Sequence, residues 1–136
     1  EQSVILVHTS AWIEFLRDTG SEVCVAVDRL LDSDLAICDA VSMEVLAGAR
    51  SERHLTQLRG LLARTTMLPT TPADYDAAAS MYRSCRASGE TVRKLIDCLI
   101  GAVAVRTGVE VLHADVDFSS LSRHTELRLH PDSLGV

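Results

Sequence analysis

The fold is decided by Val4-Ile-Leu-Val-His-Thr-Ser-Ala-Trp-Ile-Glu-Phe-Leu16 near the amino terminus. The aliphatic run at 4–7 predicts a buried strand. The pattern then breaks at His8-Thr9-Ser10 and becomes helical, with Thr9 or Ser10 as the expected N-cap. In an open parallel sheet, ligands bind where the first strand passes into the first helix. Residue 8 is therefore expected to face any functional site, and it is a histidine.

The composition is that of an aliphatic α/β domain. The chain has 136 residues, of which 47% are hydrophobic and 4% aromatic. This length is enough for one domain, taken as residues 1–136, and too short for two. Residues 1–3, which lack an initiating Met, are expected to be disordered or an addition to the native chain. The formal net charge of −6 argues against nucleic-acid binding by the overall charge of the protein. A role in binding nucleic acid therefore needs a local basic patch or metal ions.

The cysteines and the apolar runs indicate the compartment. Cys24, Cys38, Cys85 and Cys98 lie far apart in apolar surroundings, so reduced core thiols are expected. We find no signal-peptide pattern and no apolar run long enough to cross a bilayer. These patterns favour a cytoplasmic protein that does not engage a membrane, and they leave secretion by another route open.

Short aliphatic strands alternate with helices along the rest of the chain. Further strands are expected at 35–38, 66–68, 109–112 and 127–129. Helices are expected at about 21–31, 40–49, 52–63, 71–88 and 92–107, with a short helical turn after residue 113. This alternation predicts a three-layer α/β/α sandwich with a mostly parallel sheet of about five strands.

Four acids stand among apolar neighbours or directly after a strand: Glu44, Asp97, Asp115 and Asp117. A carboxylate removed from water must be paired, protonated or bound to a metal. The ends of strands 4–7 and 109–112 are expected to be neighbours, and helices 40–49 and 92–107 can each aim one acid at that edge. An all-oxygen pocket suits Mg²⁺ or Mn²⁺, and its natural chemistry is phosphodiester hydrolysis.

Each acid also has a structural alternative. Glu44 can pair with Arg50 or reach solvent. Asp97 can pair with Arg93, four residues earlier on the same helix face. The two acids after strand 109–112 can cap the short helix that follows.

The segments that carry these acids resemble those of the PIN-domain ribonucleases, and specifically the VapC toxins of bacterial VapBC toxin–antitoxin modules. The opening stretch is similar to the family's strand followed by Asp-Thr-Ser and a Trp-containing helix. Ser42-Met-Glu-Val-Leu-Ala-Gly-Ala-Arg50 resembles the segment with the family's glutamate, and Gly89-Glu-Thr-Val-Arg-Lys-Leu-Ile-Asp-Cys-Leu-Ile-Gly-Ala-Val-Ala104 the segment with its central aspartate. Leu112-His-Ala-Asp-Val-Asp-Phe118 resembles its closing acidic motif. The four matches occur in the family's order and spacing.

The resemblance implies a PIN-like fold and a set of site residues. Glu44, Asp97, Asp115 and Asp117 would form the catalytic acid pocket, and Ser10 (or Thr9) would orient a water or the scissile phosphate. Mg²⁺ or Mn²⁺ would be the cofactor, held by residue 8 together with the three aspartates.

The resemblance also implies partners. The substrate would be RNA, often tRNA, and its cleavage would arrest translation. The chain would form a homodimer and bind a VapB-like antitoxin, which lays a helix and tail in an apolar groove and blocks the acid pocket. Arg86, Arg93 and Lys94 are candidate contacts to RNA phosphates near that pocket.

His8 is the departure from the family, which has an aspartate at this position. Neutral histidine offers one nitrogen, which suits Zn²⁺ or Mn²⁺ better than Mg²⁺, and the protonated form repels cations. Two explanations are open. The favoured one is that the substitution was engineered or selected to reduce the activity of a toxic nuclease, because an unrestrained toxin is hard to produce. The other is natural divergence with an altered metal preference. We expect weakened metal binding and reduced ribonuclease activity, with the fold, the dimer and the antitoxin groove intact.

Two other functions compete with this one. A catalytically dead PIN-like module that only pairs with an antitoxin is the alternative that His8 makes serious. A phosphatase of the haloacid-dehalogenase type is suggested by Asp115-Val-Asp117 after a strand. That class is disfavoured because its nucleophile lies near the start of the chain and is followed by the core of the domain. Here only about twenty residues follow Asp117.

Overall fold

The computed structural model describes residues 4–134, so the expectation for residues 1–3 lies outside the described residues. Within them, one parallel sheet contains β1 (Ile5–Val7), β2 (Leu35–Cys38), β3 (Thr66–Leu68) and β4 (Glu110–Leu112), in the order β3-β2-β1-β4. The register aligns Val7 with Leu112. The first strand and the strand expected at 109–112 are therefore neighbours, as predicted.

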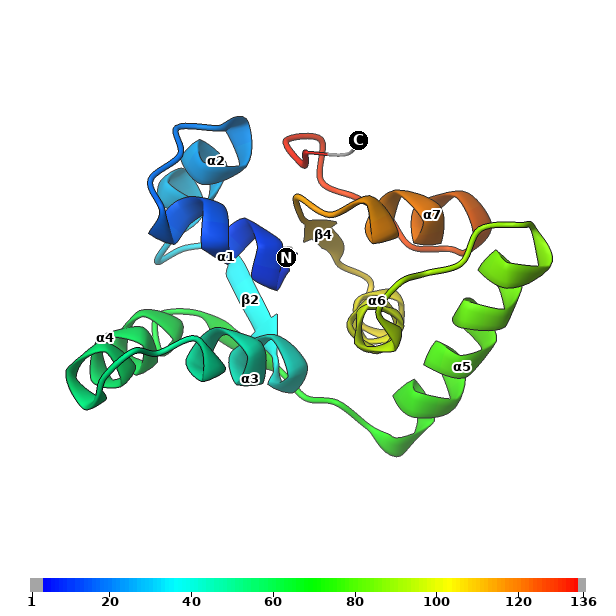
Figure 1. Cartoon of the computed structure of the whole chain (residues 1–136), viewed down its shortest axis with the longest axis horizontal. Helices are drawn as coiled ribbons and strands as arrows, with labels where there is room; N and C mark the ends of the chain where they lie inside the picture. Colours follow the sequence, from blue (N-terminus) through cyan, green and yellow to red (C-terminus); the bar gives the residue numbers. More distant parts are fainter. Residues whose placement is uncertain (1–3, 135–136) are drawn as a thin grey trace.

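Helices cover both faces of this sheet. Over the described residues they are α1 (Thr9–Leu16), α2 (Glu22–Leu30), α3 (Asp39–Ala47), α4 (Glu52–Leu62), α5 (Pro72–Ala87), α6 (Leu95–Thr107) and α7 (Val116–His124). The strands step in one direction from β1 to β3, and the chain then returns past β1 to β4. Right-handed crossovers place α1–α4 on one face and α5 and α6 on the other. Figure 1 shows α5, α6 and α7 gathered on the right and α1–α4 on the left, which confirms the α/β/α sandwich.

The expected strand at 127–129 is wrong, and the described sheet has four strands instead of about five. This segment forms only an isolated parallel bridge between Val111 and Leu129. Val111 donates its N–H to the carbonyl of Arg128 and accepts one from His130. Pro131 follows directly and has no N–H with which to extend the ladder, so the pairing stops there.

Three local expectations also differ from the structure. His8, not Thr9 or Ser10, is the N-cap of α1. Helix α6 begins at Leu95 rather than near residue 92, because the preceding backbone N–H groups donate to a side chain of α7. The short turn expected after residue 113 is a full helix of nine residues, α7, capped by Asp115.

The core lies between the sheet and the two helical layers. Its largest side chains, Trp12, Phe118, Ile37 and Ile100, are each at most 2% exposed. Burying a side chain of this size contributes about 2 kcal/mol. The four cysteines are buried and free, as expected. None of the described helices combines the length and the apolar character needed to cross a membrane.

Candidate functional site

The site begins with His8, at the end of β1. Its backbone N–H continues the pairing with β4 by donating to the carbonyl of Leu112 at 3.0 Å. The residue is 2% exposed, and its ring lies 4.4 Å from that of Phe118. The end of the first strand therefore presents a buried imidazole at the edge where ligands bind in such sheets.

Both nitrogens of this imidazole have partners. Nδ1 accepts the backbone N–H of Ser10 at 3.1 Å and lies 2.8 Å from the Ser10 hydroxyl. Nε2 lies 2.9 Å from Oδ1 of Asp97. Because Nδ1 accepts a backbone N–H, the ring carries its proton on Nε2 and donates it to Asp97. His8 thus connects the start of α1 to the first turn of α6.

Asp97, Asp115 and Asp117 lie together, and we call these three residues the acidic group. One carboxylate oxygen of each lies within 4.8 Å of the others. Asp97 and Asp117 are buried, and Oδ2 of Asp97 has no hydrogen-bond partner among the described residues. Three clustered carboxylates, one of them with a buried oxygen that has no partner, are a donor set that a hard divalent cation satisfies. The residues therefore fit Mg²⁺ or Mn²⁺.

The carboxyl groups of Asp97 and Asp117 differ in their electrostatics. Burial raises the pKa of Asp97, the neighbouring Asp117 raises it further, and the hydrogen bond from His8 opposes both effects. Burial also acts on Asp117, but hydrogen bonds from the backbone and side chain of Arg93 outweigh it and keep the pKa of Asp117 below its usual value. Of the two carboxyl groups, Asp97 therefore takes up a proton more readily, and Asp117 holds its negative charge more strongly.

Arg93 spans the other side of the acidic group. Its Nη2 lies 2.7 Å from Oδ1 of Asp115, and its Nε lies 3.2 Å from Oδ1 of Asp117. The backbone N–H groups of Arg93 and Lys94 also donate to Asp117, at 3.1 and 3.2 Å. In the structure Arg93 thus pairs with the two acids of the α7 end, instead of with Asp97 as the structural alternative had it.

Glu44 and Ser10 occupy the edge of the site. Thr9 donates its hydroxyl to Oε1 of Glu44 at 2.6 Å, so this acid is tied to the start of α1 rather than to Arg50. Glu44 does not belong to the acidic group among the described residues. The Ser10 hydroxyl accepts the N–H of Ala114 at 2.8 Å and thereby joins α1 to the segment after β4.

His113 directly follows β4, and the sequence placed it near the site as a packing or hydrogen-bonding residue at the end of a strand, without a catalytic role. It is fully buried, and burial, followed by the nearness of His8, lowers the pKa of His113 to about 4. Its neutral Nδ1 accepts the N–H of Asp115 at 3.0 Å and so fixes the segment that carries the acids. Its position directly after a buried strand, aligned with residue 8, is the signal that can reveal this role.

The remaining basic candidates lie on the surface. The Lys94 side chain is exposed, and the backbone N–H of this residue donates to Asp117. Arg86 lies on α5 with its guanidinium 5.6 Å above the ring of Tyr82, and no described contact joins it to the acidic group. Of the three predicted phosphate contacts, the structure therefore brings Arg93 and Lys94 to the site and leaves Arg86 apart.

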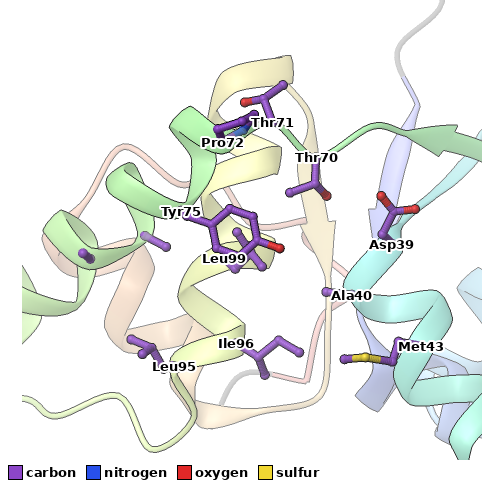
Figure 2. A pocket seen from close by; sticks show the side chains of 12 residues that line it. Asp39, Ala40, Met43, Thr70, Thr71, Pro72, Tyr75, Leu95, Ile96 and Leu99 are labelled. Carbon is purple, nitrogen blue, oxygen red and sulfur yellow. The ribbon is translucent and has the colours of Figure 1, made fainter.

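Two hollows lie beside the site. The wide groove, about 810 Å³, has walls from α3 on one side and from α5 and α6 on the other, and Figure 2 shows Met43 facing Ile96 and Tyr75 across it. The narrow groove, about 380 Å³, runs between α1, α3 and α4. Thr9 and Glu44 line the narrow groove, so this hollow leads to the edge of the site.

Comparisons with known proteins agree with this geometry. The family model described as "PIN domain" matches residues 5–124. The chain is 43% identical over 129 residues to VapC ribonuclease Mb1587 of Mycobacterium bovis and equally to Ribonuclease VapC11 of Mycobacterium tuberculosis, covering 92% of this chain and 96% of each relative.

Solved structures show the same fold. The DNA-bound VapBC structure from Salmonella typhimurium gives a TM-score of 0.73 at 16% identity, covering 95% of this chain and 98% of the matched one. VapC20 of Mycobacterium tuberculosis, described as a Sarcin-Ricin loop cleaving toxin, gives a TM-score of 0.65 at 20% identity, covering 91% of this chain and 98% of the matched one.

Proposed function

Because this chain belongs to the PIN-domain family and, within it, to the VapC proteins, we propose that it is the endoribonuclease toxin of a toxin–antitoxin module. The observation that carries the proposal is the acidic group, in which one carboxylate oxygen of each aspartate lies close to the others and the buried Oδ2 of Asp97 has no partner among the described residues. The relatives at 43% identity are named ribonucleases, which supports RNA as the substrate.

The acidic group is proposed to hold Mg²⁺ or Mn²⁺. Bound there, such an ion would supply the chemistry of phosphodiester hydrolysis, namely activation of a water and stabilisation of the leaving oxygen. The chain's own residues fix the geometry: donors from Arg93 and Lys94 hold Asp117, and the imidazole of His8 holds Asp97. Glu44, fixed by Thr9, is proposed to orient a water at the edge of the site. The Ser10 hydroxyl already accepts the N–H of Ala114 and lies next to His8. Its proposed role is therefore to position α1 and His8, and also to orient the phosphate of a bound RNA.

His8 is proposed to weaken this activity. Its Nε2–H donates to Oδ1 of Asp97 and so reduces the negative charge that this carboxylate offers to an ion, and His8 contributes no negative charge of its own. The same observation favours the second candidate function, a catalytically inactive module that only binds an antitoxin. Both nitrogens of His8 already have hydrogen-bond partners, so a metal can use neither without breaking a contact.

Partners are proposed from the two grooves. The narrow groove reaches Thr9 and Glu44, so a VapB-like helix lying in it can extend a tail over the acidic group. The wide groove has exposed apolar side chains on three helices, Met43, Tyr75 and Leu95, and is proposed as the contact between two copies of the chain. The RNA target is proposed to be structured, of the tRNA kind, and cleaved in the cytoplasm, with Arg93 and Lys94 contacting its phosphates.

Cleavage mapping on total RNA tests this function. The chain and its His8→Asp variant are incubated with RNA and Mg²⁺ or Mn²⁺, with and without a chelator. We expect metal-dependent cuts by the variant and a rate lower by about 10- to 100-fold for the chain itself. A His8→Asp/Asp97→Asn double variant is the matched control and should not cleave. Absence of cleavage by His8→Asp, in a protein that still binds its antitoxin, would favour the binding module.

A further inference from the structure

The acidic group already has a positive charge across it. The Arg93 guanidinium contacts Asp115 at 2.7 Å and Asp117 at 3.2 Å, while its side chain remains 61% exposed. Among the described residues no hydrogen bond or ion pair joins it to Asp97, whose Oδ2 has no partner there. Arg93 therefore pairs with two of the three acids and does not reach the most deeply buried one, Asp97.

We propose that Arg93 is the chain's own counter-cation, which occupies Asp115 and Asp117 in the metal-free protein and competes with the divalent ion for them. This inference rests on the proposed function, because it takes the acidic group as the metal site. A compact ion has the advantage of contacting all three acids at once, whereas the guanidinium contacts two. Metal binding therefore requires the guanidinium to leave, and Arg93 sets how much metal is needed.

The backbone, rather than the guanidinium, holds the acids in place. The N–H groups of Arg93 and Lys94 donate to Asp117, and these donors remain in any variant of the Arg93 side chain. Asp115 accepts the N–H of Asp117 and donates its own N–H to His113. Removing the guanidinium is thus expected to free two carboxylates without displacing them.

Release of Arg93 is expected to be easy. Its side chain is 61% exposed, so water partly screens its ion pairs with Asp115 and Asp117, and the long side chain loses freedom on pairing. An ion pair of this kind lowers the affinity for the metal without preventing its binding. The expected effect on affinity is accordingly a few-fold change rather than an all-or-none one.

Calorimetric titration with Mn²⁺ alone tests the inference. We compare Arg93→Gln with Arg53→Gln, which removes the same charge from an exposed position on α4, in the chain and in the His8→Asp background. We expect Arg93→Gln to lower the Mn²⁺ dissociation constant by about fivefold, and Arg53→Gln to change it by less than about twofold. An unchanged or higher dissociation constant in Arg93→Gln, or an equal change in both variants, overturns the inference.

The failure of this inference and that of the proposed function give different results. If His8→Asp binds Mn²⁺ and cleaves RNA but Arg93→Gln does not alter the dissociation constant, only the role of Arg93 is refuted. If no protein of the set binds Mn²⁺, the role of Arg93 is refuted together with the metal site on which it rests.

Discussion

At the scale of single residues, His8 has two tasks. Its Nδ1 caps α1, and its Nε2–H donates to Asp97. An aspartate at this position can perform the first task, since carboxylates are good N-caps, but it has no proton with which to perform the second. His8 therefore stabilises the metal-free site and makes it less attractive to a cation.

Two isosteric variants should separate the roles of the buried acids. Burial raises the pKa of Asp97, which favours its neutral form, so Asp97→Asn is expected to change the free energy of unfolding by less than about 1 kcal/mol without metal. Asp117, in contrast, is a carboxylate that accepts hydrogen bonds from the backbone and side chain of Arg93. Asp117→Asn should therefore lower the free energy of unfolding by about 1–3 kcal/mol. Urea denaturation in the presence of a chelator measures both. Equal losses in the two variants would contradict this assignment of charge.

At the scale of elements, an ion pair between the buried Asp74 and the exposed Arg106 joins the start of α5 to the end of α6. Asp74, which is 2% exposed, accepts from Nε and Nη2 of Arg106 at 2.8 and 3.1 Å. It also accepts the N–H of Thr71 at 2.8 Å, which caps α5. Because α5 and α6 form one wall of the wide groove, this pair holds the shape of that wall.

The Asp74 pair predicts a pH dependence of stability. Hydrogen bonding by Arg106 is the main cause that holds the pKa of Asp74 below its usual value, against the opposing effect of burial. The contribution of Asp74 is therefore complete above the unfolded-state pKa of about 4 and is lost as pH falls through the lower folded-state value. At neutral pH, Asp74→Asn is expected to lose about 1–3 kcal/mol of unfolding free energy.

Urea unfolding from pH 7 down to pH 2 measures this dependence. The difference between the chain and Asp74→Asn should narrow as the solution becomes acidic. Asp76→Asn, at an exposed position on the same helix, is the matched control and should leave stability nearly unchanged. A difference that stays constant down to pH 2 would show that Asp74 does not act through its charge.

Most helices and strands could be predicted from the sequence, because the spacing of apolar residues along the chain reflects which side chains are buried. The error at the start of α6 arose because a distant partner decides the local structure there. Helix α6 starts late because Asp117 takes the N–H groups of Arg93 and Lys94, and a contact between residues so far apart leaves no local pattern. The acidic group was predicted from acids in apolar surroundings, whereas the ion pairs of Arg93 with both α7 acids depend on exact side-chain positions.

At the scale of the whole molecule, the wide groove predicts the oligomeric state. Tyr75, which is 63% exposed, lies on its wall, so two copies can bury apolar area by joining there. Tyr75→Glu places a charge in this contact and is expected to shift the chain from dimer to monomer in light scattering after gel filtration. Val25→Glu, at a 56% exposed position on α2, should remain a dimer. The same mass for both variants would refute the assignment of this groove.

The central claim is that His8 weakens a divalent-metal site, and thermal unfolding of the chain and its His8→Asp variant, with a chelator and with Mn²⁺, tests it most directly. With the chelator, His8→Asp should unfold at the lower temperature, because it loses the donor to Asp97 and adds a fourth carboxylate to the site. With Mn²⁺, its unfolding temperature should rise by several degrees, since binding to the folded state stabilises it, while that of the chain barely moves. Equal shifts in the two proteins, or a larger shift in the chain with His8, would contradict the claim.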